Sequence, residues 1–395
     1  MRSRWSILAV LFAVRATMAF QFQSVAAVAP LLRSEFHLDL ADIGLLIGLY
    51  LAPGTVLALP GGAIGQRLGD KPAVLAGTVL MLVGGLVMTL IHSWAGQVSG
   101  RLIAGTGGVL LSVLMTKMVA DWFAGRELST AMAIFINSWP AGLAISLLVL
   151  PPIGQVHGIS GVYGSVLLLV IAGMLFLAFA YQPSAVKAPP STTVWVNLDR
   201  TTVMPLIFAA LIWTFYNVGF AMIFSFGPSV LVERGWSISP AGSTTSIVLW
   251  LAAFFGPLGG FIADQTKRQN LVLVAGWLVF ATLLILAPRL GPIVPIIVAL
   301  GIVCALPSGP IMSLPACVLP PDMRAVGMGL FYTIYFLGMM LGPTVGGTYA
   351  SWVGTAGAAF DFGAAMLLIC PILLWAFHHS RSASQSASSS RQANT

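Results

Sequence analysis

Two arginines lie inside long apolar segments of this chain, where a charged side chain is costly to bury without a partner. Arg15 stands about three helical turns into the first apolar segment, and Arg101 lies near the start of the fourth. A guanidinium is a planar fork of N–H donors that matches the oxygens of a carboxylate, a nitrate-like ion or a phosphate. The two positions therefore predict a site for an anion.

Carboxylates that could neutralise these arginines are scarce. Asp361 is the only acid well inside an apolar segment, and the other acids fall in the polar connections. A cavity around the arginines would then carry net positive charge and prefer an anion. Two alternatives stay open: Arg15 can extend along its apolar stem to a polar surface, and Arg101 can serve structure or gating instead of binding.

Polar and aromatic residues on a later apolar segment could line the same cavity. Trp213, Tyr216, Asn217 and Phe220 recur at i, i+3, i+4 and i+7, so a helix places them on one face. Asn, Trp and Tyr can donate hydrogen bonds to an anion without adding charge, although such a stripe also serves ordinary packing. The predicted binding residues are Arg15, Gln21, Asn137, Trp213, Tyr216, Asn217, Tyr332 and Tyr335.

The composition requires lipid around the elements that hold these residues. Charged residues make up 7% of the chain and hydrophobic residues 58%, whereas a soluble domain has about 25% and 45–50%. The apolar runs are continuous and do not alternate with polar residues, which excludes a membrane β-barrel. Cys304, Cys317 and Cys370 lie in apolar runs without metal spacing. We expect no cofactor and no metal.

Twelve apolar segments are long enough for helices that cross a bilayer, so we predict an all-α integral membrane protein with 12 transmembrane helices. The N-terminal run is too long and too polar for a signal peptide, and we take it as a retained first helix. The predicted spans are 6–32, 41–64, 73–92, 95–117, 128–152, 160–181, 203–231, 240–263, 270–288, 291–318, 325–350 and 355–377.

Loop charges predict the orientation of these helices. Lys and Arg concentrate on the side that bears both termini, and this bias places that side in the cytoplasm of an inner (plasma) membrane. The same bias accounts for the net charge of +7 without a nucleic-acid partner. We expect an N-terminal six-helix bundle (1–182), a cytoplasmic linker (183–202), a C-terminal six-helix bundle (203–378), a disordered cytoplasmic tail (379–395) and a monomer.

Two pairs of similar segments predict that the bundles are duplicates. LALPGGAIGQRLGDKPAVLAG (57–77) matches FFGPLGGFIADQTKRQNLVLVAG (254–276), and STAMAIFINSWPAG (129–142) matches AVGMGLFYTIYFLG (325–338) at nearly the same offset. A parallel duplication of six helices is an architecture of transporters. The first pair resembles the loop motif between helices 2 and 3, and between helices 8 and 9, of the major facilitator superfamily. GRLIAGTGG (100–108) resembles the start of helix 4 in that family.

The resemblance implies two pseudo-symmetric bundles around a central cavity lined by helices 1, 4, 7 and 10, and a set of conformational residues. Close-set glycines let helices approach and slide, and basic residues in the turns can meet helix C-termini or acids as a latch. These basic residues can alternatively serve orientation alone. Gln66 replaces the family's acid in the first copy, which weakens that latch. The implied gating residues are Gly62, Arg67, Lys71, Arg101, Gly105, Gly260, Asp264, Lys267 and Arg268.

These features favour a carrier of a small organic or inorganic anion that works by alternating access between the bundles. The first helix, ending in SVAAVAPLL, is similar to the cyanate and nitrate/nitrite branches of the superfamily. An exporter of hydrophobic or cationic drugs is the alternative, but it would want a cavity carboxylate. We expect no enzyme, since no nucleophile or phosphate-loop constellation is present. Without a mid-membrane acid, exchange, facilitated diffusion or a proton carried on the substrate fits better than a protein-borne proton site.

Overall fold

The computed structural model describes residues 3–57, 67–123, 127–183, 200–319 and 324–393, and every regular element in them is helical. Eleven segments are long and apolar enough to cross a membrane. One of them, Thr130–Ala180, has 51 residues and would measure about 77 Å as a straight helix, more than twice the apolar thickness of a bilayer. Gly158 breaks it with φ 64° and ψ −167°, a backbone conformation that glycine adopts freely. The described segments therefore make twelve crossings.

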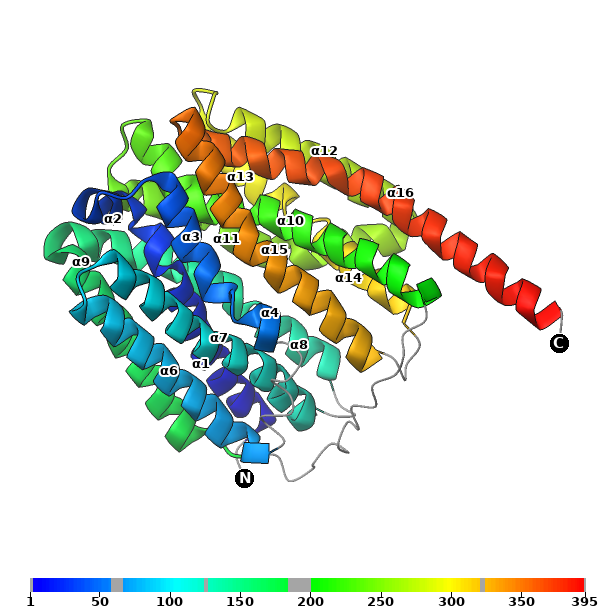
Figure 1. The fold of residues 1–395 in the computed structure, drawn as a ribbon, viewed down its shortest axis with the longest axis horizontal. Helices are drawn as coiled ribbons and strands as arrows, with labels where there is room; N and C mark the ends of the chain where they lie inside the picture. The colour runs from blue at the N-terminus through cyan, green and yellow to red at the C-terminus, as the bar shows by residue number, and fades with distance from the viewer. Residues whose placement is uncertain (1–2, 58–66, 124–126, 184–199, 320–323, 394–395) are drawn as a thin grey trace.

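The helices form two bundles that follow the chain order (Figure 1). The first bundle contains α1 (Arg4–Ala27), α2 (Ala29–Phe36), α3 (Leu40–Leu51), α4 (Gly54–Leu57), α6 (Asp70–Leu90), α7 (Trp94–Phe123), α8 (Leu128–Ile136) and α9 (Ser138–Ala180). The second contains α10 (Arg200–Glu233), α11 (Ile238–Thr266), α12 (Gln269–Leu286), α13 (Ile293–Val303), α14 (Ser308–Ser313), the 3₁₀ turn η1 (Pro315–Cys317), α15 (Arg324–Val353) and α16 (Gly357–Ala393).

Several spans that the sequence predicts as one helix are broken. Breaks separate α1 from α2, α3 from α4, α8 from α9 and α13 from α14. Each break lies within a few residues of a proline, namely Pro30, Pro53, Pro140 and Pro307. Proline lacks the N–H that a helix needs and its ring clashes with the carbonyl four residues earlier, which explains the interruptions.

The tail expected to be disordered continues as helix. α16 runs on to Ala393 and projects beyond the bundles (Figure 1). No proline or glycine follows Pro371 in the sequence, so nothing in the backbone chemistry of this segment stops the helix. The predicted linker falls mostly on residues 184–199, which lie outside the described part of the chain.

The bundles meet through glycines that allow backbone contact. α3 packs on α15, and α9 packs on α11. A Cβ at Gly44 would lie 2.1 Å from the carbonyl oxygen of Pro343, and a Cβ at Gly242 would lie 2.3 Å from that of Leu147. These pairings join helix 2 to 11 and helix 8 to 5, which a six-helix duplication makes equivalent.

Side-chain hydrogen bonds join the two bundles at the end of the molecule that bears α2. The Gln23 side-chain amide donates to the carbonyl of Phe224 at 2.6 Å, and the Ser239 hydroxyl donates to Gln155 at 2.6 Å. Both bonds join α1 or α9 of the first bundle to α10 or α11 of the second. The molecule is therefore closed at this end.

Candidate functional site

A cavity of about 510 Å³ lies between the two bundles. Nine elements of the described chain line it: α1, α3, α7, α8, α9, α10, α11, α14 and α15, of which α11 adds only small residues. The polar and aromatic residues that line the cavity are Arg15, Ser112, Asn137, Trp139, Trp213, Tyr216, Asn217, Phe220, Phe224, Ser308, Tyr332, Tyr335 and Phe336.

Arg15 is the one charged side chain among the described residues that line this cavity. Its Nη1 donates to the carbonyl of Phe135 at 3.2 Å, and its Cζ lies 4.7 Å from the centre of the Phe135 ring, a cation–π contact. Nε is buried and has no hydrogen-bond partner in the described part of the chain. The guanidinium is thus held by one residue while part of its donor set stays available.

The predicted stripe on α10 does line the cavity. Trp213 packs against Tyr216, with ring centres 5.7 Å apart, and against Tyr335 of α15, at 6.3 Å. The Trp213 indole N–H is buried without a partner among the described residues. The Asn217 amide donates to the Trp213 carbonyl at 2.7 Å. The stripe therefore supplies one free donor and an aromatic surface.

Tyr216 has a second role. Its hydroxyl donates to the carbonyl of Cys304 at 2.6 Å, directly before the break between α13 and α14. That carbonyl lies in the last turn before Pro307, where the helix loses its regular hydrogen bonds. Tyr216 thus ties α10 to the broken helix that brings Ser308 to the cavity.

Asn137, Tyr332 and Tyr335, which the sequence predicts from the second repeat pair, also line the cavity. Asn137 lies at the junction of α8 and α9, two residues beyond Phe135. The rings of Tyr332 and Tyr335 lie edge to face, 6.2 Å apart. The structure therefore brings three neutral polar side chains to the cavity that contains Arg15.

Gln21 does not line the cavity. It is 2% exposed, its amide donates to the carbonyl of Met81 at 2.9 Å, and its side-chain oxygen accepts from Tyr50 at 3.2 Å. α1 turns this residue into the first bundle, between α3 and α6. We therefore drop Gln21 from the candidate site.

Arg101 lies apart from the cavity as well. It is fully buried and donates to three backbone carbonyls: Leu46 at 2.8 Å, Gln21 at 3.1 Å and Phe22 at 2.8 Å. Its guanidinium also lies over the Tyr50 ring, at 4.8 Å. Arg101 therefore ties α7 to α1 and α3 within one bundle.

Asp361, the acid nearest the membrane interior by sequence, does not pair with either membrane arginine and instead pairs with Arg289 at 2.7 Å.

Ser112 and Ser308 line the cavity but are absent from the predicted set. Both lie on helices 4 and 10, which the family resemblance assigns to the cavity wall. That assignment could have pointed to them, yet a lone serine in an apolar helix carries no pattern of its own. Its direction depends on the rotation of the helix, which only packing fixes.

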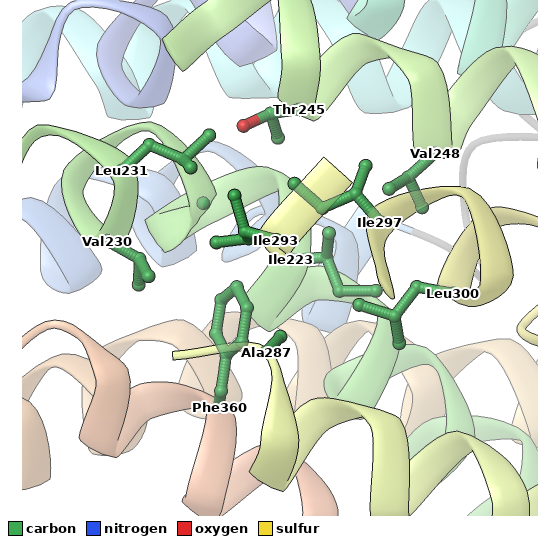
Figure 2. A pocket seen from close by; sticks show the side chains of 11 residues that line it. Ile223, Val230, Leu231, Thr245, Val248, Ala287, Ile293, Ile297, Leu300 and Phe360 are labelled. Atoms are coloured by element: carbon green, nitrogen blue, oxygen red, sulfur yellow. The ribbon is translucent and has the colours of Figure 1, made fainter. Parts of the chain in front are cut away.

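A second, smaller pocket lies among α10, α11, α13 and α16 (Figure 2). Its walls are apolar side chains apart from Thr245, whose hydroxyl donates to Ala241 in its own helix. The space amounts to about 10 Å³, close to the minimum for a single water molecule. This pocket is a small apolar packing defect, so the larger cavity is the candidate binding site.

Comparison with known proteins decides the family. The family model for the Major Facilitator Superfamily matches residues 11–240 and 214–395. The chain belongs to the Major Facilitator Superfamily. Two solved structures share its fold with a TM-score of 0.73: a D-xylose–proton symporter at 16% identity, covering 94% of this chain and 97% of that one, and a bacterial homologue of the human lysosomal transporter Spinster at 19% identity, covering 98% and 94%.

Among curated proteins, the hexuronate transporter of Bacillus subtilis (strain 168) matches at 25% identity over 178 residues, which is 40% of this chain and 40% of that protein. The match thus spans less than half of either chain. As a superfamily member, this chain is a multi-pass membrane transporter for a small molecule and not an enzyme.

The superfamily motif residues of the first bundle make contacts within that bundle. Lys71 donates to the carbonyls of Ala178 at 2.8 Å and Tyr181 at 3.0 Å, at the C-terminal end of α9 where the helix dipole favours a cation. A Cβ at Gly105 would lie 2.1 Å from the Tyr50 carbonyl oxygen, so α7 and α3 touch through their backbones. Arg67 is exposed, and Gly62 lies outside the described residues.

In the second bundle, the close helix contact involves Gly259, although the sequence predicts it at Gly260. A Cβ at Gly259 would lie 1.9 Å from the Leu306 carbonyl oxygen, whereas a Cβ at Gly260 would meet nothing within 4 Å. Lys267 ends α11 with φ 53°, and Arg268 precedes α12; both are exposed. The Asp264 backbone belongs to α11, but its side chain lies outside the described part. Gly259, and not Gly260, is therefore the glycine that close packing requires.

Proposed function

We propose that this superfamily transporter carries a small organic or inorganic anion by alternating access between its two bundles. The observation that carries the proposal is Arg15, whose guanidinium is the one charged group among the described residues of the cavity wall. Burial without a carboxylate partner leaves this charge to be neutralised by a ligand. A carboxylate, with two oxygens in a plane, matches the guanidinium fork.

Neutral donors support the same conclusion. Trp213 has a buried indole N–H without a described partner, and Asn137 and Tyr335 lie on the same cavity. Donors of this kind stabilise an anion without adding charge that would have to be compensated elsewhere. The similarity to a hexuronate transporter, whose name indicates a sugar carboxylate, makes D-glucuronate a first compound to test.

The remaining features of the proposal concern placement. We propose that the chain is a monomer in the inner (plasma) membrane. Both termini are placed in the cytoplasm because Lys and Arg concentrate in the connections on that side. The closed end that bears α2 then faces outwards. The cavity, in this arrangement, belongs to an inward-facing state.

Thermal stabilisation tests the proposed substrate class, since a ligand that binds only the folded protein raises its melting temperature. The purified transporter is measured with D-glucuronate, pyruvate, benzoate, nitrate and sulfate, and with tetraphenylphosphonium as a lipophilic cation. We expect a rise with at least one anion, its loss in Arg15→Gln, and its retention in Arg289→Gln, which removes an exposed arginine outside the cavity.

A rise with tetraphenylphosphonium alone would overturn the anion proposal and favour the drug exporter. An anion response that survives unchanged in Arg15→Gln would remove Arg15 from the site. Arg15→Lys keeps the charge but loses the planar fork, so we expect a weakened response that confirms the variant still folds.

A further inference from the structure

The charge of the cavity wall is set by a single group. Of the described lining residues, Arg15 is charged and the others are neutral, including Asn137, Asn217, Tyr332 and Tyr335. Arginine cannot lose its proton under physiological conditions. The described wall also lacks an acid or a histidine that could change its charge by taking up or releasing a proton. The described lining residues therefore give the empty cavity one positive charge throughout the physiological pH range.

The contacts of Arg15 within the protein do not replace those that water gives. Nη1 donates to the Phe135 carbonyl and the guanidinium lies against the Phe135 ring, while the buried Nε has no partner in the described part of the chain. In the open cavity, water can solvate the rest of the guanidinium. When the bundles close around the cavity during the transport cycle, that water must leave.

Closing the empty cavity thus places a partly bonded cation in a low-dielectric interior, which is strongly unfavourable. One singly charged anion restores neutrality and supplies the missing acceptors. A dianion would give the closed cavity one net negative charge, and a neutral compound would leave the positive charge of Arg15 unpaired. The cost of an unpaired charge at bilayer depth slows closure by about 100-fold or more.

We infer that this transporter is an obligate one-for-one exchanger of monovalent anions. The inference rests on the proposed function and adds to it the charge of the substrate and the mode of transport. The loaded cavity is neutral and can change its access, whereas the empty cavity cannot return without an anion from the other side. Net uptake of an anion into a compartment without a counter-anion is then blocked.

Reconstituted vesicles separate exchange from net transport. Vesicles containing the purified protein are loaded with unlabelled D-glucuronate, pyruvate, benzoate or nitrate, and uptake of the same anion in isotopically labelled form is measured. Matched vesicles are loaded with sulfate, a dianion. We expect uptake into the monoanion-loaded vesicles to be faster by about 100-fold.

Membrane potential gives a second readout. Because one monoanion neutralises Arg15, the exchange step moves no net charge through the protein, and a potassium diffusion potential set with valinomycin should leave the exchange rate unchanged. Equal uptake into sulfate-loaded vesicles, or net uptake driven by a potential or a proton gradient, would overturn the exchange inference while leaving an anion transporter. Absence of uptake in every loading, together with absence of thermal stabilisation by these anions, would overturn the proposed function as well.

Variants at Arg15 test the reason for exchange. In Arg15→Gln the empty cavity is neutral, so the ratio of exchange to net uptake should fall towards one, even if both rates are low. Arg15→Lys should keep a high ratio because it keeps the charge. Arg289→Gln serves as the control with an unchanged ratio. A purely structural role for Arg15 would lower both rates in Arg15→Gln and leave their ratio as high as in the wild type, which would contradict the inference.

Discussion

Arg15 contacts Phe135 twice, through a hydrogen bond of 3.2 Å to its carbonyl and through a cation–π contact of 4.7 Å to its ring. Arg101 makes the opposite use of the same side chain, since each of its three nitrogens donates to a backbone carbonyl. Arg15 keeps an unbonded donor in the described part of the chain, whereas the nitrogens of Arg101 are all used to hold α7 against α1 and α3. This difference supports the proposed binding role of Arg15 and a structural role for Arg101.

The first prediction follows from Arg101. Arg101→Gln removes donors from buried carbonyls of α1 and α3, and unsatisfied buried acceptors cost about 1–3 kcal/mol each. We expect a melting temperature several degrees lower, with the anion-induced rise kept in the protein that remains folded. A variant with wild-type stability and no anion response would show that Arg101 belongs to the site.

The second prediction concerns the paired glycines of α11. Gly259→Ala would place a methyl group against the Leu306 carbonyl, and overpacking of this kind costs about 1–3 kcal/mol. Gly260→Ala points into open space and is the matched control, with an expected change within about 0.5 kcal/mol. Thermal unfolding of both purified variants checks the order. Equal stability of the two would refute the packing difference.

The third prediction tests the contact between α3 and α15. Gly44→Ala would bring a methyl group against the Pro343 carbonyl, which belongs to a backbone that cannot move aside cheaply. The closed end should therefore open more often. Ser225 is a fully buried position in α10. In a protein whose native cysteines are replaced by alanine, Ser225→Cys can be labelled by a membrane-impermeant thiol reagent. More frequent opening of this end should make that labelling faster.

A destabilisation of about 1 kcal/mol corresponds to a roughly 5-fold increase in that labelling. Gly164→Ala is the control, because a Cβ there meets nothing within 4 Å. Labelling that rises equally in both variants would indicate a general loss of stability instead of an opening of this end.

The fourth prediction uses the hydrogen bond between Gln23 and the Phe224 carbonyl. Gln23→Met keeps a similar shape but loses the donor, and a net loss of about 0.5–1.5 kcal/mol should raise labelling of Ser225→Cys by about 2- to 10-fold. Gln23 and Gly44 act on different contacts between the bundles, so their effects should add. Unchanged labelling would mean that this bond does not hold the end closed.

The fifth prediction is a pH dependence at the start of α3. Partial burial raises the pKa of Asp39, but hydrogen bonds from the Asp42 N–H and the Ser351 hydroxyl outweigh it and hold the pKa below its ordinary value. The carboxylate also caps α3, accepting from the Asp42 N–H at 2.8 Å. Since the folded state has the lower pKa, the stabilisation is complete above the unfolded pKa and is lost as the pH falls through the folded one.

Asp39→Ala should therefore lower stability by about 0.5–2 kcal/mol at neutral pH, and the difference from the wild type should shrink in acid. Thermal unfolding at a series of pH values measures this. Asn can still cap a helix but cannot ionise. The stability of Asp39→Asn at neutral pH should therefore lie between those of the wild type and Asp39→Ala, without a contribution from titration at position 39. A difference that grows in acid would contradict the sign.

Much of the site could be predicted because helices repeat regularly. The spacing of Trp213, Tyr216 and Asn217 puts them on one face whatever the fold, and the structure turns that face to the cavity. Gln21 shows the limit of this reasoning. Its depth in α1 is similar to that of cavity residues such as Met18, but the rotation of the helix points it towards Met81. Rotation depends on the neighbours, which the sequence of one helix does not contain.

The sequence by itself determined the membrane environment, the twelve crossings, the duplication and the scarcity of acids, since each depends on composition or periodicity along the chain. The tertiary structure decided which arginine has free donors, which glycine of a pair is packed, and which end of the molecule is closed. These properties depend on distances between residues far apart in the sequence. Hydrogen bonding and packing act through such distances, and only the folded arrangement of the helices sets them.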